Sequence, residues 1–219
     1  MKRFVLGELA VASALFVLAM PVFGDDMGAT NSATATPSVT PSDFVWDASL
    51  INLKEIRLGE AAQTNSQNKA VQDFGKHMVR DHTRLNERLV RIAKSEGLEL
   101  PDTNIFDVPV MQPPEEKEAT ELMTETPQQR LQRAQWDVHS LVLLSGPDFD
   151  RAYADAMVQG HEKAIQKFQD ASAALQDDQL KRYAERGLII IRRHYEMAQK
   201  LQSEVETNAP AGTNAAPNM

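Results

Sequence analysis

Four segments of the chain repeat their apolar residues every three or four positions. This spacing is typical of amphipathic helices that pack one face against a core. Strand signals between these segments are scarce, and helix-forming residues dominate. We therefore predict an all-α domain over residues 42–206, with helical stripes at 44–62, 71–92, 149–168 and 180–205.

Local signals place the ends of these helices. Ser42 or Asp43 is a plausible cap for the first helix, and a polar turn at 64–68 separates it from the second. Gly97 ends the second helix, and the Ser-Gly-Pro-Asp turn at 145–148 opens the third. Short turns within each pair of helices make the partners antiparallel.

A long connection, residues 98–145, separates the two helical pairs. Its first part contains four prolines and is expected to be an irregular loop. Residues 115–123 and 128–144 carry helical patterns, and the second of these has an apolar face that could pack along the other helices. We predict a crossover with extra short helices.

Each of the four stripes is interrupted near its middle by an ionisable residue. Burying such groups is unfavourable unless they bond to one another, to water or to a metal. Counted from the turns at about 1.5 Å per residue, the interruptions share one level of the domain within roughly a helical turn. They are Glu55, Asp81 with His82, His161 and His194.

Two hypotheses explain this layer. A hydrogen-bonded polar layer that fixes the register of the helices is favoured by the sequence taken alone. The other hypothesis is a metal site with Glu55, His82, His161 and His194 as ligands, to which Asp81 adds a ligand or an acceptor that orients an imidazole. Such a set suits one Zn, Cu, Ni or Fe ion, and no cysteine is present to compete as a ligand.

The two ends of the chain differ in composition from the domain. Residues 1–24 have a basic start, an apolar run and small residues at a cleavage position, which predicts an export signal, with an uncleaved anchor as the alternative. Residues 25–41 and 207–219 have the composition of a flexible linker and a disordered tail. We expect a periplasmic or secreted protein without a stable membrane span after cleavage.

Charge and motifs restrict the partners and the chemistry. The formal charge of −8 and the absence of a basic run argue against nucleic acid. No nucleophile-base motif, phosphate-cradling glycine loop or dinucleotide fingerprint is present, so an enzyme is not the favoured interpretation. Envelope proteins are the partners we expect, and the hypothesis that competes with metal binding is a non-enzymatic envelope stress or interaction protein.

Three motifs resemble those of a known family. They are Phe-Gly-Lys-His-Met-Val-Arg-Asp-His at 74–82, Gly-Pro-Asp-Phe-Asp-Arg-Ala-Tyr at 146–153 and Met-Val-Gln-Gly-His-Glu at 157–162. They look like those of exported bacterial proteins grouped as domain of unknown function 4142, over roughly residues 43–201. The resemblance implies a ferritin-like four-helix bundle with a long crossover between the second and third helices, and it assigns no activity.

The chain departs from the di-iron pattern of ferritin-like proteins. Those proteins use Glu-x-x-His on two of their helices. Val79, Val158 and Ile191 stand three residues before the three histidines, so no such motif exists here. We therefore predict a single-ion site, if a metal is bound, and not a carboxylate-bridged di-iron centre.

Overall fold

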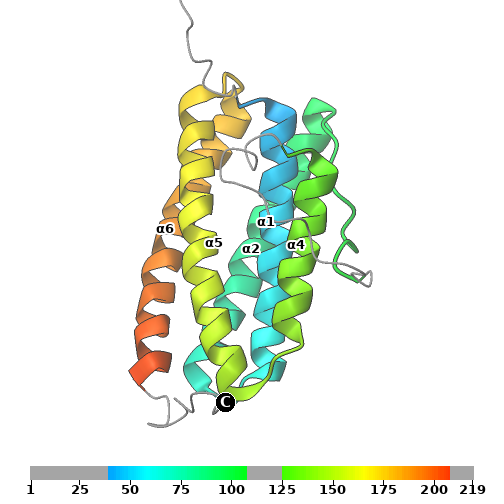
Figure 1. Cartoon of the computed structure of the whole chain (residues 1–219). Helices are drawn as coiled ribbons and strands as arrows, with labels where there is room; N and C mark the ends of the chain where they lie inside the picture. The colour runs from blue at the N-terminus through cyan, green and yellow to red at the C-terminus, as the bar shows by residue number, and fades with distance from the viewer. Residues whose placement is uncertain (1–38, 108–124, 208–219) are drawn as a thin grey trace, which may run out of the picture. The chain divides into compact units, whose positions relative to one another are not determined.

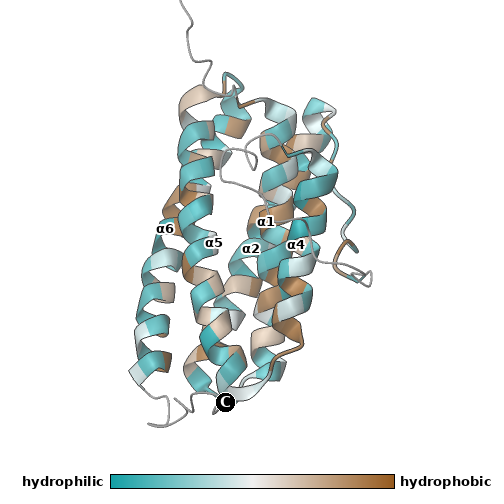
Figure 2. Cartoon of the chain, viewed as in Figure 1, coloured by the Kyte–Doolittle hydropathy of each residue, from teal (hydrophilic) through white to brown (hydrophobic). Residues whose placement is uncertain are grey.

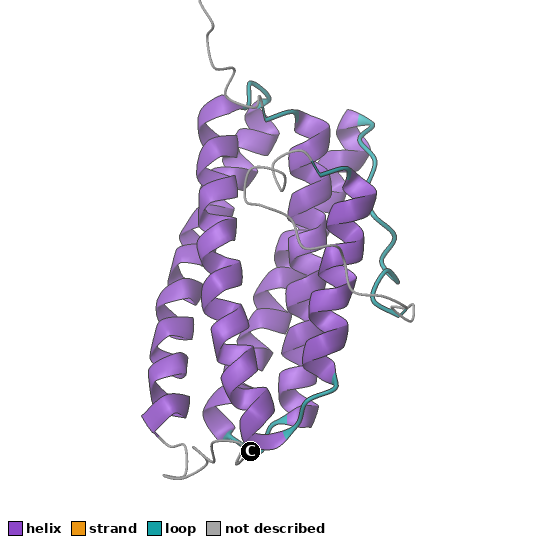
Figure 3. Ribbon diagram, viewed as in Figure 1, coloured by secondary structure: helices purple, strands orange, loops and turns teal. Residues whose placement is uncertain are grey.

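The computed structural model describes residues 39–107 and 125–207, and within these ranges every regular element is an α-helix (Figure 3). The prediction of an all-α protein is confirmed for this part of the chain. The helices belong to one compact unit. They are α1 (Pro41–Asn65), α2 (Lys69–Glu96), α4 (Pro127–Val142), α5 (Gly146–Ala174) and α6 (Asp178–Thr207). The predicted signal, most of the linker, the expected helix at 115–123 and nearly all of the tail lie outside the described residues.

The start of α1 differs from the prediction. The side chain of Thr40 accepts a hydrogen bond from the backbone N–H of Asp43 at 3.1 Å, so Thr40 is the cap and the predicted caps Ser42 and Asp43 lie inside the helix. Thr40 precedes Pro41, whose fixed backbone angle suits a first helical position. At the other boundary, Gly97 ends α2 in the left-handed conformation with φ 65°, as predicted.

Each helix packs against neighbours that follow from the short connections. Helix α1 pairs with α2 and α5 pairs with α6, while α2 also contacts α6 and α1 contacts α5 (Figure 1). Helix α4, predicted at 128–144, packs mainly on α1. In Figure 2 much of the ribbon of α5 and α6 is teal, the colour of hydrophilic residues. No helix in the described ranges combines the length and apolarity needed to cross a membrane.

The interior is divided into two apolar clusters. One contains Phe44, Leu89 and Phe168, and the other contains Leu58, Met78 and Tyr153, together with further residues of the same helices. On all four long helices, a buried polar residue stands between the positions that belong to one cluster and those that belong to the other. The polar layer therefore has apolar packing on both sides, which excludes solvent from it along the helix axes.

Two glycines allow α1 and α2 to approach closely. A Cβ placed on Gly75 would lie 2.7 Å from the carbonyl oxygen of Gly59 and 2.7 Å from Cβ of Ala62. We expect Gly75→Ala to lower the free energy of unfolding by about 2 kcal/mol, because a backbone clash cannot be relieved by a rotamer change and overpacking outweighs the gain in helix propensity. Urea unfolding followed by circular dichroism measures the change.

Gly160 provides the matched control, since it is also a helical glycine. A Cβ there would meet only Oε1 of Glu55 at 3.6 Å, which is ordinary contact. Gly160→Ala should therefore leave stability unchanged or raise it by up to about 1 kcal/mol through helix propensity. Equal losses for the two variants would contradict the close approach of α1 and α2 as the cause.

Candidate metal centre

Three imidazoles meet in the polar layer, one each from α2, α5 and α6. His82, His161 and His194 are at most 2% exposed. Their ring centroids are separated by 5.3 Å to 6.0 Å. Each histidine lies on the apolar face of its helix, which points into the core. Apolar clusters pack on both sides of the layer, and the three rings face one another between them.

The orientation of His82 is set from α1 and α6. Its Nδ1 lies 3.0 Å from Oδ1 of Asn52, and Nδ2 of Asn52 donates to the hydroxyl of Tyr183 at 3.0 Å. Because the amide nitrogen of Asn52 is used in that second bond, its oxygen faces the imidazole and must accept from it. This assigns the proton of neutral His82 to Nδ1 and leaves a lone pair on Nε2.

His161 is held by its own helix. Its Nδ1 lies 2.8 Å from the backbone carbonyl oxygen of Met157, one turn earlier in α5. A carbonyl oxygen can only accept, so Nδ1 carries the proton and donates. The lone pair of His161 is then on Nε2, as in His82.

His194 uses the opposite nitrogen. Its Nε2 lies 3.2 Å from Oδ2 of Asp81, whose carboxylate also accepts two hydrogen bonds from Arg80 at 2.8 and 3.0 Å. Hydrogen bonding to Arg80 lowers the pKa of Asp81 to about 2, so this carboxylate is charged at neutral pH. The proton of His194 is therefore on Nε2 and its lone pair is on Nδ1.

Burial keeps two of the rings neutral. Desolvation, followed by the charge of His161, lowers the pKa of His194 to about 4. Desolvation and the neighbouring imidazoles also lower the pKa of His82 well below its usual value. The contact between His194 and Asp81 is thus a hydrogen bond from a neutral imidazole to a carboxylate at pH 7. Neutral imidazole is the form that binds metal ions.

Each ring has one nitrogen left without a partner, and the three rings are close together. Nε2 of His82, Nε2 of His161 and Nδ1 of His194 are all buried and find no hydrogen-bond partner among the described residues. One nitrogen from each ring lies within 4.8 Å of the others. All three nitrogens present lone pairs, so the rings cannot satisfy one another. A tetrahedral zinc ion with ligands at 2.0–2.1 Å would hold its nitrogens about 3.3 Å apart, so the rings would have to move closer together to bind it.

Glu55 lies in the same layer but outside this group of three. It is 4% exposed, and its Oε1 lies beside Gly160, the residue before His161. Its Oε2 is buried and unpartnered within the described residues. Burial and the charge of Glu55 raise the pKa of Tyr153 well above its usual value, which places a neutral phenol close to this carboxylate.

A cleft reaches this side of the layer. It has a volume of about 280 Å³, lies among α1, α4 and α5, and is lined by Glu55 and Gly160. Its outer wall carries ion pairs, among them Lys54 with Asp137 at 2.6 Å. Glu55 thus lines the cleft beside Gly160, the residue of α5 that precedes His161.

The structure distributes the five predicted site residues in three ways. His82, His161 and His194 form one cluster; Asp81 accepts a hydrogen bond from Nε2 of His194, the nitrogen that points away from the cluster; Glu55 lies at the edge that faces the cleft. The prediction named Glu55 and the three histidines as ligands, with Asp81 as a further ligand or an orienting acceptor; in the structure the three imidazoles cluster and the two carboxylates lie outside the cluster. The sequence had left open both a ligand and an orienting role for Asp81.

Sequence reasoning missed Asn52, which orients His82. Asn52 is 1% exposed, whereas the apolar residue beside it in the sequence, Ile51, is half-buried. A signal was present, because Asn52 follows Ala48 by four residues and precedes Glu55 by three, which places all three residues on one helix face. A polar residue in that register could have been recognised.

One comparison with known proteins gives a match. The sequence model of the family described as domain of unknown function (DUF4142) matches residues 27–201, which is most of the chain. No curated protein matches the chain. No solved structure matches it.

Proposed function

We propose that this chain, which belongs to the family described as domain of unknown function DUF4142, binds one divalent transition-metal ion in its polar layer. His82, His161 and His194 are the ligands. The observation that carries the proposal is the convergence of three buried imidazole nitrogens, each without a partner among the described residues, on rings whose other nitrogens are held in place. Ligand histidines in metalloproteins are oriented in the same manner, through their second nitrogen.

The surrounding charges suit a cation. Asp81 is charged, and its hydrogen bond with His194 connects it to the proposed centre. Glu55 adds a buried carboxylate in the layer. Three imidazoles without a thiolate suit Zn, Cu, Ni or Fe, and they leave a fourth position for another ligand. We propose Glu55, on α1, for that fourth position. Its carboxylate would bind the metal after a side-chain movement, or it would accept a hydrogen bond from a metal-bound water.

We propose the ferritin-like four-helix bundle as the fold. The pairing of α1 with α2 and of α5 with α6, together with contacts from α1 to α5 and from α2 to α6, supports it. The residues between α2 and α5 then form the crossover that carries α4. The absence of Glu-x-x-His on any long helix argues against di-iron chemistry in this bundle.

The competing proposal is a non-enzymatic envelope protein whose polar layer is structural. The hydrogen bonds from His82 through Asn52 to Tyr183 favour it, because they connect α2, α1 and α6 and would fix the register of these helices. Both proposals assume export directed by residues 1–24, and neither includes a catalytic step. They differ in whether the three free ring nitrogens receive a metal.

Metal uptake separates them. Full-length protein is stripped with chelator, reloaded with Zn²⁺ or Cu²⁺, desalted and analysed for metal content. We expect about one ion per wild-type chain and none in His161→Leu, because two imidazoles remain and the leucine fills the space of the third ring. Asp81→Ala should bind 10–100-fold more weakly, since it removes the acceptor that holds His194.

His139→Leu is the matched control. His139 is a half-buried histidine on α4 that does not belong to the cluster, so its replacement should leave one ion bound. Loss of uptake in this variant would point to metal held elsewhere. If the wild-type protein takes up no ion under any loading condition, the structural layer becomes the explanation of the three histidines.

A further inference from the structure

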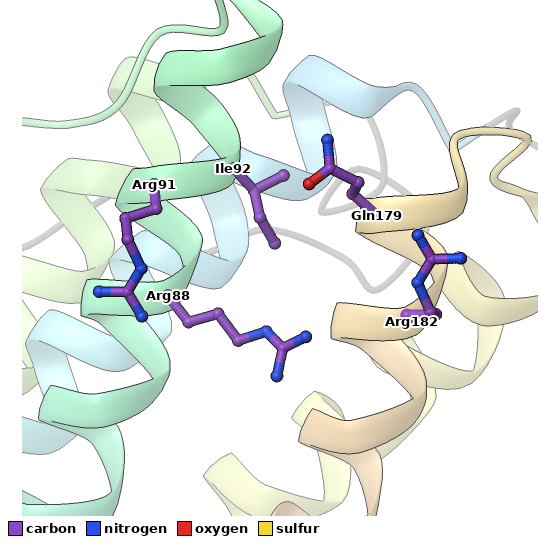
Figure 4. Close-up of a pocket in the computed structure, with 5 residues that line it drawn as sticks. All are labelled: Arg88, Arg91, Ile92, Gln179 and Arg182. Atoms are coloured by element: carbon purple, nitrogen blue, oxygen red, sulfur yellow. The ribbon is translucent and has the colours of Figure 1, made fainter.

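A second cleft lies between α2 and α6, away from the histidine cluster. It has a volume of about 430 Å³ and is lined by Arg88, Arg91 and Ile92 from α2 and by Gln179 and Arg182 from α6. Figure 4 shows Arg88 extending from α2 toward the facing helix, where Gln179 and Arg182 lie. The opening is thus bordered by three guanidinium groups that come from two helices.

The charges of these arginines are poorly balanced. Within the described part of the chain, neither Arg88 nor Arg91 lies within 4.0 Å of a carboxylate, and Arg182 has only an exposed ion pair with Asp178 at 3.6 Å. The chain as a whole has 31 acidic and 23 basic residues, so carboxylates are abundant elsewhere. Gathering three permanent cations with one exposed carboxylate partner among them costs Coulomb energy, which a bound anion would offset.

The other lining groups help to define the ligand. The Nε2 of Gln179 donates to Glu96 at 2.8 Å, which holds the amide at the edge of the cleft and leaves one of its N–H bonds free. Gln179 also belongs to the first turn of α6, where the helix dipole favours negative charge. Ile92 supplies an apolar wall. The negative charge of Glu96 opposes an anion, but the three guanidinium charges that line the cleft outweigh it.

We propose that this cleft binds a phosphate-type dianion, carried by a small organophosphate, by pyrophosphate or by a lipid headgroup. Guanidinium groups form pairs of parallel hydrogen bonds with phosphate oxygens, and three of them can engage a tetrahedral group from different sides. The volume of the cleft lies in the range of small-molecule sites and leaves room beyond the phosphate for the rest of a ligand.

Calorimetric titration of full-length protein with pyrophosphate tests the proposal. Chelator-treated protein in buffer without divalent ions is used, so that pyrophosphate cannot act through a metal and the result does not depend on the histidine centre. Wild-type protein should bind about one pyrophosphate per chain. Arg88→Gln and Arg182→Gln should each weaken binding at least tenfold, with unchanged circular dichroism and a melting temperature at least as high, because each removes a like-charge repulsion.

The matched control is Arg193→Gln. Arg193 is an exposed arginine on α6, eleven residues or about 16 Å beyond Arg182, which exceeds the Debye length of about 8 Å at physiological salt. This variant should bind pyrophosphate like the wild type. Equal weakening in Arg193→Gln and Arg182→Gln would indicate general attraction by surface charge and would overturn the proposal.

Lipid vesicles decide between the sources of the phosphate. Vesicles of phosphatidic acid in phosphatidylcholine are sedimented with the protein, alongside vesicles of phosphatidylcholine alone. If the wild type pellets with phosphatidic acid vesicles and Arg88→Gln does not, the cleft binds a lipid headgroup. If the protein binds pyrophosphate but does not pellet with vesicles, the cleft binds a soluble ligand. Failure of both pyrophosphate and phosphatidic acid to bind would refute the anion site.

Discussion

Loading with metal is expected to raise the melting temperature of the wild-type protein by about 12 °C when Zn²⁺ exceeds its dissociation constant a thousandfold. An ion that binds only the folded state stabilises it by about 4 kcal/mol under this condition, and each kcal/mol corresponds to about 3 °C for a chain of this size. Thermal unfolding followed by circular dichroism, with chelator and with Zn²⁺, measures the shift.

Replacement of one ligand sharpens this test. His161→Leu should show no shift with Zn²⁺, because two imidazoles do not make the site. Without metal, the same variant should be at least as stable as the wild type, since leucine fills the space and removes a buried nitrogen that has no partner. With metal, the wild type should therefore be more stable than His161→Leu. Without metal, it should be equally stable or less stable.

A purely structural layer predicts the opposite pattern. In that case chelator and Zn²⁺ leave the melting temperature of the wild type unchanged, and His161→Leu is destabilising under both conditions. His139→Leu should follow the wild type in both conditions, because this side chain lies on α4 and outside the cluster. A Zn²⁺ shift that persists in His161→Leu would remove the proposed site.

The metal-free protein is expected to lose about 3 kcal/mol of stability between pH 6.5 and pH 5. In the unfolded chain, His82 and His194 become protonated below about pH 6.5. In the folded chain burial lowers both pKa values, that of His194 to about 4, so the folded state does not take up these protons in the same range. Stability then falls as pH falls, at a rate for each imidazole that rises from about 0.7 kcal/mol per pH unit at pH 6.5 toward about 1.4 kcal/mol per pH unit at lower pH.

Urea unfolding at pH 7, 6.5, 6, 5.5 and 5 in the presence of chelator measures this loss. His194→Leu should retain about half of the slope, because one of the two groups is gone, and Asp81 keeps its hydrogen bonds from Arg80. Asp81 does not contribute to the loss between pH 6.5 and pH 5, because the stability linked to its lowered pKa is lost only between about pH 4 and pH 2. A flat profile from pH 6.5 to pH 5 would show that the imidazoles are not buried in the neutral form.

The ends of most helices could be read from neighbouring residues. Gly97 ends α2 because its left-handed backbone conformation strains other residues, and the polar turn at 64–68 separates α1 from α2 as expected. Thr40 was missed because the residues that follow it, Ser42 and Asp43, are equally good caps in isolation. Only the folded backbone decides which side chain reaches a free N–H group.

The layer of ionisable residues was also predictable, because helical periodicity determines which residues face inward and counting from the turns gives their height. Sequence alone could not decide what each residue does there. Asp81 and His82 are neighbours in the chain, yet His82 enters the cluster and Asp81 remains at its edge, where it is shared by Arg80 and His194. Adjacent helical residues point about 100° apart, so the packing of α6 settles their roles.

Sequence alone determined the helical class of this protein, the spacing of its apolar stripes and the inward position of three histidines, because these follow from local periodicity and residue chemistry. The tertiary structure decided which nitrogen of each ring is free, that Glu55 faces a cleft and that Arg88 lies across from Arg182. These features depend on side-chain rotamers and on contacts between helices that are far apart in the chain, and no local pattern encodes them.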